Sequence, residues 1–460
     1  MKNSIITLSL VGGLLAVSTQ NAVPDPFAEL DSATSAPSSA PGAQSSSSSE
    51  MSEFEKFKQQ HLGEFKSYKQ QLMEEFNEFK KISQVESERY QKELGTVWDK
   101  PELSTKKTWV TYSEDKQTKN KVDFEKQTIT ISTQVGKDKK LADEALRKKL
   151  RALIMQNQAQ AFKEDKVAQA VEKKSKEKLK LIKTSEVRPT PIVLPLVTND
   201  PKPSPKKVDK IVDDLLKGKK ETVEKSAKKT NKVVTVEIPI PPVKEEPIKK
   251  QPVKKAPTKT AEVKPVEKAS PKAKVMADQR FNKLPRKARE ISNPVAEFAK
   301  KANVDIELVY AIIETESAFN PMAKSPIPAF GLMQIVPGSA GMDATQKLFG
   351  KGRILSPSYL YDRDQNIEVG TTYLNILYFS YLKGVKDPLS RLYCVIAAYN
   401  TGAGNVSKAF IGTKKLRNAL PVINSKSPQQ VYDHMIKNLP YEETQNYLKK
   451  VVTRMPKYKA

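Results

Sequence analysis

The chain of 460 residues carries 79 Lys and Arg against 53 Asp and Glu, a formal net charge of +26. Its hydrophobic share of 38% is below the roughly 45–50% of an ordinary globular chain, so part of it is not expected to pack into a core. One Cys excludes an intramolecular disulfide framework, and two His make a zinc site of the usual ligand sets unexpected. The basic excess favours an anionic partner. Because it is spread over the whole chain, it argues against a dedicated nucleic-acid-binding surface.

The N-terminus has the pattern of a secretory signal. Lys2 precedes an apolar run from Ile5 to Val17, and small residues around it fit cleavage after Ser18. The run is shorter than the roughly 20 residues that span a bilayer, which favours a cleaved signal peptide at 1–18 over an uncleaved anchor. No Cys follows it that could carry a bacterial lipid anchor. We expect a periplasmic protein with no nucleic-acid partner. Peripheral association with the cell envelope stays open.

An 11-residue repeat occupies residues 51–95, after a Ser- and Pro-rich tether at 19–50. Phe54, Phe65 and Phe76 share one position of the repeat, and Phe57, Tyr68 and Phe79 share another. A period of 11 is about 3.67 residues per turn, so the aromatic side chains form a stripe along one long helix. We expect this stripe to pack on the next domain or on another helix. A membrane-surface helix and helix-mediated self-association are alternatives.

Residues 96–240 predict a mixed α+β domain. Alternating apolar residues predict strands between 97 and 134 and again at 233–240, and a period near 3.6 predicts helix over 141–183. Residues 241–278 are rich in Lys and Pro and lack aromatic residues, which is typical of a disordered, extended linker. A compact helical domain is expected over 279–460.

Two carboxylates lie near the end of a helix predicted at 304–318, before the stop signal Asn320-Pro321. Glu314 and Glu316 are two residues apart, which places their side chains about 200° apart around the helix. They therefore cannot share one pocket, and at most one faces the core. A buried carboxyl group there would have its pKa raised towards the working range of a general acid.

Further motifs follow this helix in a fixed order, with Ala329–Gln334, Ala397–Asn405 and Leu439–Tyr447 after Ala311–Pro321. The ordered series resembles the soluble-lytic-transglycosylase domain, which has a goose-lysozyme-like fold. It covers about 180 residues. Upstream, Val97-Trp98 and the segments 108–112 and 122–133 resemble the N-terminal domain of the membrane-bound lytic murein transglycosylase C family. Three features depart from that family and count against membrane attachment, without affecting the catalytic motifs. They are the Phe-rich repeat, the Lys/Pro linker and the missing lipid-anchor Cys.

The resemblance implies an α+β protein: a mainly α-helical lysozyme-like catalytic domain preceded by a smaller α+β domain. It also implies a murein lytic transglycosylase, which cleaves the β-1,4 bond between N-acetylmuramic acid and N-acetylglucosamine without net hydrolysis. Glu316 matches the catalytic Glu of the family and Glu314 does not. As an acid, Glu316 would protonate the glycosidic oxygen. As a base, it would then deprotonate the muramoyl C6 hydroxyl, which closes a 1,6-anhydro ring.

Matching positions give supporting roles. Ser325 and Gln334 would bind the N-acetylated sugar, Tyr399 would lie near Glu316 or the N-acetyl group, and Asn400 would hold the loop and the sugar. Tyr447 would approach the acid from the C-terminal helix. Glycan strands of peptidoglycan are the implied partner, and neither a cofactor nor a metal is implied. The alternative is a catalytically silent peptidoglycan-binding or structural protein of the same fold.

Overall fold

The computed structural model describes residues 48–136, 142–225, 232–242 and 284–459. The expected signal peptide, most of the tether and nearly all of the Lys/Pro linker lie outside the described residues, as do the side chains of Phe54, Phe57 and Phe65. The described part is mostly helical with one small five-stranded sheet. The predicted fold class, α+β with a mainly helical C-terminal part, is confirmed.

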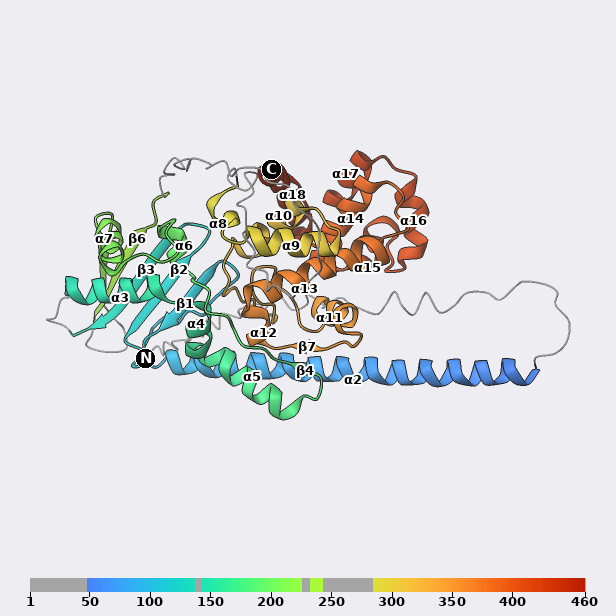
Figure 1. The fold of residues 1–460 in the computed structure, drawn as a ribbon, viewed down its shortest axis with the longest axis horizontal. Helices are drawn as coiled ribbons and strands as arrows, with labels where there is room; N and C mark the ends of the chain where they lie inside the picture. The colour runs from blue at the N-terminus through green and yellow to red at the C-terminus, as the bar shows by residue number, and fades with distance from the viewer. Residues whose placement is uncertain (1–47, 137–141, 226–231, 243–283, 460) are drawn as a thin grey trace, which may run out of the picture.

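The repeat region forms a single long helix, α2 (Ser48–Leu94). Figure 1 shows it running beneath both the sheet and the C-terminal helices. In its C-terminal half Leu72, Phe76, Phe79 and Ile82 are buried. Phe79 meets Phe330 of the C-terminal domain edge to face, with ring centroids 6.5 Å apart. The described part of the aromatic stripe therefore packs on the next domain, as predicted.

The sheet is antiparallel, with strand order β1-β2-β3-β6-β5. Its strands are β1 (Thr108–Tyr112), β2 (Thr118–Asp123), β3 (Thr128–Val135), β5 (Lys220–Lys225) and β6 (Lys232–Pro239). The register places Trp109, Val122, Ile129 and Ile238 in one buried row across four strands. Strand β5 was not predicted, because all six of its side chains are exposed and show no apolar alternation.

The helix predicted over 141–183 is divided, which corrects that prediction. The structure has α3 (Asp143–Met155), α4 (Gln158–Glu164) and α5 (Lys166–Lys178), followed by the short strand β4 (Ile182–Lys183). Asn157 caps α4 in a reciprocal capping box with Gln160, and the Asp165 carboxylate accepts from the Ala168 N–H at the start of α5. These polar caps start new helices where apolar periodicity alone suggested one. Two more helices, α6 (Leu194–Val197) and α7 (Pro205–Leu216), precede β5.

The C-terminal part is a bundle of helices around α10 (Ile306–Ser317), which is buried along most of its length. Helix α10 contacts α9, α18 and η3, and β7 pairs in parallel with β4 from the N-terminal part. The elements are α8 (Arg286–Arg289), α9 (Ser292–Ala302), α11 (Ala340–Phe349), β7 (Ile354–Leu355), α12 (Pro357–Tyr361), α13 (Arg363–Ile376), η2 (Leu377–Tyr381), α14 (Pro388–Thr401), α15 (Ala403–Ile411), α16 (Leu416–Asn424), α17 (Pro428–Asn438), α18 (Glu442–Arg454) and η3 (Met455–Tyr458).

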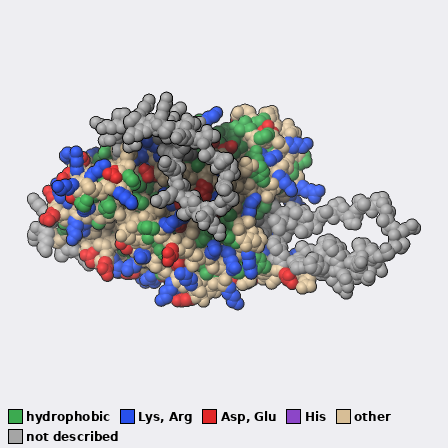
Figure 2. Space-filling view, in the orientation of Figure 1, with side chains coloured by type: hydrophobic (Ala, Val, Ile, Leu, Met, Phe, Trp, Pro, Cys, Tyr) green, Lys and Arg blue, Asp and Glu red, His purple; other side chains and the backbone are tan. Residues whose placement is uncertain are grey.

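The surface shows how the positive charge is distributed. Figure 2 shows Lys and Arg side chains mixed with Asp and Glu over the visible face, without a single basic patch. Within the described ranges, no helix is both long enough and apolar enough to cross a membrane.

Candidate active site

Glu316 occupies the last turn of α10, at a sharp change in chain direction. Ala318 caps the helix in the left-handed conformation with φ 52°, and Phe319 follows with φ 68°. Non-glycine residues rarely adopt such angles, which cost free energy and are enriched at functional sites. The Ser317 hydroxyl donates to the Ile313 carbonyl at 3.0 Å, which is a structural role inside the helix. The chain therefore turns away directly after Glu316.

The two carboxylates near the end of α10 have different environments, as their spacing predicted. Glu314 accepts hydrogen bonds from Lys457 at 2.8 Å and from the Tyr458 hydroxyl at 2.6 Å. Burial opposes its ionisation, but Lys457 and Tyr458 outweigh burial and hold the pKa of Glu314 below its usual value. Glu316 is only 6% exposed and lies on another side of the helix. Glu314 is thus held as a structural carboxylate.

The surroundings of Glu316 suit a general acid. Burial raises the pKa of Glu316, and the nearby Lys106 ammonium offsets part of this increase. Lys106 Nζ lies 3.7 Å from Glu316 Oε2. The hydroxyl of Tyr447 is buried without hydrogen-bonding geometry to any partner, yet it is close enough to lower the pKa of Glu316 slightly. Because burial dominates, Glu316 keeps its proton at higher pH than an exposed glutamate.

Two tyrosines complete this cluster. Tyr399 of α14 donates its hydroxyl to the Met333 carbonyl at 2.9 Å. Burial raises the pKa of Tyr399 and of Tyr447 well above the usual value, and the charge of Glu316 adds to the effect. Both phenols therefore stay neutral beside the carboxyl group. The structure brings Glu316, Tyr399 and Tyr447 together from α10, α14 and α18.

The other predicted site residues are held by intramolecular hydrogen bonds. Gln334 has a left-handed backbone with φ 50°, and its amide donates to the Gly331 carbonyl at 3.1 Å while its Oε1 is buried without a partner. The Ser325 hydroxyl donates to the Ile327 carbonyl. The Asn400 amide oxygen accepts from Thr444 of α18 at 2.7 Å. Gln334 thus presents a free acceptor, whereas Ser325 bonds within its own loop and Asn400 links α14 to α18.

The segment 329–334 is fixed from behind by Asn366, which is fully buried in α13. Its amide donates to the carbonyls of Phe330 at 2.8 Å and Leu360 at 2.9 Å, and its oxygen accepts from the Met333 N–H at 2.8 Å. Gly331 lies against it with φ 74°. The need for glycine at 331 therefore comes from this close approach within the domain.

Sequence reasoning missed Lys106, because nothing in its local pattern separates it from the other basic residues. It precedes β1, far from α10 in the chain, and only the tertiary structure places it beside Glu316. Its ammonium group also lies 3.7 Å from Glu443 at the start of α18.

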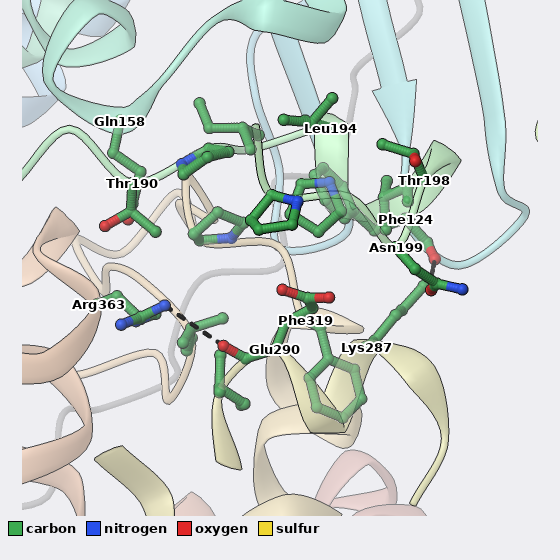
Figure 3. Close-up of a pocket in the computed structure, with 18 of the residues that line it drawn as sticks. Phe124, Gln158, Thr190, Leu194, Thr198, Asn199, Lys287, Glu290, Phe319 and Arg363 are labelled. Carbon is green, nitrogen blue, oxygen red and sulfur yellow. Dashed lines mark hydrogen bonds between the residues drawn. The ribbon is translucent and has the colours of Figure 1, made fainter. Parts of the chain in front are cut away.

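A separate pocket of about 350 Å³ lies between the N-terminal part and the C-terminal helices. Figure 3 shows Phe124, Leu194 and Phe319 on its wall, with Lys287 and Glu290 among its charged residues. Burial lowers the pKa of Lys287 to about 8, with Glu314 partly opposing the change. The lining includes none of the predicted sugar-binding residues or Glu316. It is therefore distinct from the acid cluster.

Comparisons with known proteins agree with the two resemblances seen in the sequence. The transglycosylase SLT domain matches residues 293–420, and the N-terminal domain of membrane-bound lytic murein transglycosylase C matches residues 73–177. Membrane-bound lytic murein transglycosylase C of Pectobacterium atrosepticum is 41% identical over 178 residues, which are 39% of this chain and 49% of that protein. The Klebsiella pneumoniae protein of the same name is 42% identical over the same shares. The chain thus spans about half the length of the curated relatives it matches.

Solved structures of lytic transglycosylases are also similar in sequence over part of the chain. The 70 kDa soluble lytic transglycosylase of Escherichia coli is 27% identical and covers 38% of this chain and 25% of that one, with a TM-score of 0.29. The domain matches and the curated relatives make this chain similar to the lytic transglycosylases, and within them to the C type.

Proposed function

We propose that this chain is a murein lytic transglycosylase that cleaves the β-1,4 bond between N-acetylmuramic acid and N-acetylglucosamine. The observation that carries the proposal is Glu316, a buried carboxyl group with a raised pKa. It lies within the residues that match the SLT domain, at the position that the motif resemblance gives to the catalytic Glu.

In the first step Glu316 donates its proton to the glycosidic oxygen. The bond from C1 of the muramoyl residue to that oxygen breaks, and the N-acetylglucosamine leaves with a hydroxyl group. In the second step the carboxylate takes the proton of the muramoyl C6 hydroxyl, whose oxygen bonds to C1. No water is consumed, and Glu316 ends protonated as it began. One residue serves both steps because its protonation state alternates between them.

A single carboxyl group is sufficient if the N-acetyl group of the substrate stabilises the positive charge at C1. Most glycosidases use a second carboxylate for this purpose. Here Glu314 cannot serve, because Lys457 and Tyr458 hold it away from Glu316. The neutral hydroxyls of Tyr399 and Tyr447 and the free acceptor of Gln334 are suited to bind amide and hydroxyl groups of the sugar. The intramolecular attack gains from proximity.

The test is a pair of isosteric variants on one helix. Purified sacculi are incubated with the wild type, Glu316→Gln or Glu314→Gln, and the released muropeptides are separated by mass spectrometry. Loss of the general acid should reduce the rate at least about 100-fold. Glu314→Gln should keep cleavage within about threefold while lowering the melting temperature, because its interactions are structural.

The products decide among the reaction types. A transglycosylase releases 1,6-anhydromuramic ends, whereas a hydrolase releases reducing ends that are heavier by one water. Equal release by the wild type and Glu316→Gln would overturn the proposed mechanism. Binding to sacculi without release of soluble fragments would instead favour the catalytically silent binding protein.

We further propose a periplasmic location, with peripheral contact between the dispersed basic surface and the anionic envelope. Such contact is electrostatic and therefore weakens as salt screens it. Cell fractionation at low and high salt tests this: a peripheral protein moves from the membrane fraction to the soluble fraction as salt rises. Self-association through α2 is tested by the sedimentation of the purified chain.

A further inference from the structure

The ion pair between Lys106 and Glu316 connects two parts of the protein. Lys106 belongs to the loop before β1 of the N-terminal sheet, and Glu316 ends α10 of the C-terminal helices. The Glu316 side chain is 7% exposed and that of Lys106 is 38% exposed, so the cation reaches an almost buried carboxyl group from the protein surface.

The backbone of the Lys106 loop is fixed on the turn that follows Glu316. The Asn320 amide group donates to the carbonyls of Thr105 at 3.5 Å and Lys106 at 3.4 Å, and the Lys324 N–H donates to the Thr105 carbonyl at 3.3 Å. The Asn320 oxygen accepts from the Met322 N–H at 3.0 Å. Asn320 is fully buried, so one side chain orders the catalytic turn and holds the N-terminal loop.

The loop itself is stiffened by Thr105. Its hydroxyl accepts from the Lys107 and Thr108 N–H groups at 3.3 and 3.1 Å, and its N–H donates to the Thr108 carbonyl at 2.9 Å. A loop that is ordered by its own hydrogen bonds and anchored on Asn320 carries the Lys106 backbone at a defined place. The position of the ammonium group then depends only on its side chain.

Glu443 gives this ammonium group a second partner. It lies at the start of α18, 3.7 Å from Lys106 Nζ, and is 61% exposed. The groups facing Glu316 are therefore Lys106 from the N-terminal loop, Glu443 and Tyr447 from α18, and Tyr399 from α14. Of these, Lys106 provides the positive charge and Glu443 a competing negative charge.

We propose that Lys106 is a positioning residue for Glu316, which makes the N-terminal sheet domain part of the catalytic machinery. Its ammonium group orients the carboxyl group and stabilises the carboxylate that forms after proton donation. This inference rests on the proposed function of Glu316. Glu443 limits the effect by sharing the cation, so that Glu316 still carries a proton when substrate binds.

The experiment measures the initial rate of anhydromuropeptide release from sacculi at sub-saturating substrate, from about pH 4 to about pH 9. Activity falls at high pH when Glu316 loses its proton before substrate binds. Lys106→Met should move this fall to higher pH and lower the maximal rate on the order of 10-fold. Lys106→Arg should retain most of the wild-type maximal rate and the wild-type pH of the decline. Glu443→Gln should move the decline in activity to lower pH.

Lys107→Met is the matched control, since it removes an equal charge from the adjacent residue, which pairs with Glu125 instead. It should keep the wild-type profile. If the pH at which activity falls shifts in opposite directions in Lys106→Met and Glu443→Gln, a purely structural role cannot explain the result. Melting curves identify a variant that fails to fold, and the exposed Glu443 then still provides a test.

Two results would contradict the role of Lys106, and they can be distinguished from each other. If Glu316→Gln is inactive but Lys106→Met, folded as the wild type, has the wild-type profile, the role of Lys106 is wrong and the proposed function stands. If Glu316→Gln is as active as the wild type, the proposed function fails first, and the role of Lys106 falls with it.

Discussion

Phe76 of α2 occupies the space that a side chain at Gly338 would need. A Cβ atom built on Gly338 would lie 2.0 Å from Cγ of Phe76. Phe76 is 5% exposed, so this contact helps to seal the long helix against the C-terminal helices. The repeat region and the C-terminal helices are therefore joined where a large side chain packs directly against a glycine.

Removing Phe76 should weaken the docking of α2. Phe76→Ala should reduce the free energy of unfolding by about 3 kcal/mol, because a large buried ring is replaced by a cavity. Met73→Ala, on an exposed face of the same helix, should change it by less than about 0.5 kcal/mol. Urea unfolding followed by circular dichroism measures both.

The contact with Gly338 adds a coupling test. Gly338→Ala alone should displace the Phe76 ring and destabilise the protein, whereas in the Phe76→Ala background it should cost much less. Additive effects in the double variant would show that the two residues do not interact as described.

A second contact between the parts is the pair formed by Arg188 and Asp362. The Arg188 Nε donates to Asp362 Oδ2 at 2.7 Å, a second guanidinium nitrogen bonds Oδ1, and the carboxylate also caps α13 by accepting from the Gln365 N–H at 3.0 Å. Because Asp362 is only 1% exposed, Arg188→Leu leaves a buried charge with one partner fewer. We expect a loss of about 3 kcal/mol in unfolding free energy. Lys207→Met, in an exposed pair with Asp200, should cost much less.

This loss should also depend on pH. Burial opposes the ionisation of Asp362, but Arg188 and the Gln365 N–H outweigh it and hold its pKa below the usual value. A carboxyl group with a lowered pKa contributes stability above its unfolded pKa, and that contribution disappears as pH falls through the folded pKa. The difference between the wild type and Arg188→Leu should therefore shrink in acid. A difference that did not shrink as pH falls well below the unfolded pKa of Asp362 would contradict this electrostatic origin.

Asp343 should have the opposite dependence. Burial raises its pKa to about 7, although the Tyr381 hydroxyl, 2.9 Å from Oδ2, partly opposes the change. Between about pH 4 and about pH 7 the folded protein keeps this proton while the unfolded chain releases it, so stability falls as pH rises through that range. Asp343→Asn removes the penalty. Its unfolding free energy relative to the wild type should increase with pH and level off above about pH 7.

The second variant for this prediction is Tyr381→Phe. It removes a group that favours the ionised carboxylate and so raises the pKa of Asp343 further, which should extend the decline in stability to higher pH. If Asp343→Asn differs from the wild type by the same amount at every pH, Asp343 does not titrate as described.

Gly331 should not tolerate a side chain. Its φ is 74°, and a Cβ atom would lie 2.3 Å from the amide nitrogen of Asn366 and 2.4 Å from the Leu360 carbonyl oxygen. Gly331→Ala should cost more than about 2 kcal/mol and reduce sacculus cleavage, because the segment leading to Gln334 must move. Gly350→Ala, with φ 68° but no atom within 4 Å, isolates the backbone strain and should cost about 1 kcal/mol. Equal losses of unfolding free energy in Gly331→Ala and Gly350→Ala would mean that the contact with Asn366 does not contribute to the requirement for glycine.

Short-range features of this protein follow from the sequence because short-range physics sets them. The 11-residue aromatic spacing predicted the long helix, strand alternation predicted β1, β2, β3 and β6, and a two-residue spacing separated Glu314 from Glu316 around α10. The caps at Asn157 and Asp165 are also short-range features, but the apolar periodicity over 141–183 predicted a single helix across both of them. Strand β5 had no local signal, since an exposed edge strand needs no apolar alternation.

The electrostatic environment of the candidate acid was decided only by the tertiary structure. The sequence, through its motifs, singled out Glu316, Tyr399 and Tyr447, but not the charge that faces them. Lys106 lies 210 positions before Glu316 and reaches it because β1 and its neighbours dock on the turn at Asn320. Interactions between charges depend on distance through space and on burial, and neither quantity is encoded in the spacing of residues along the chain.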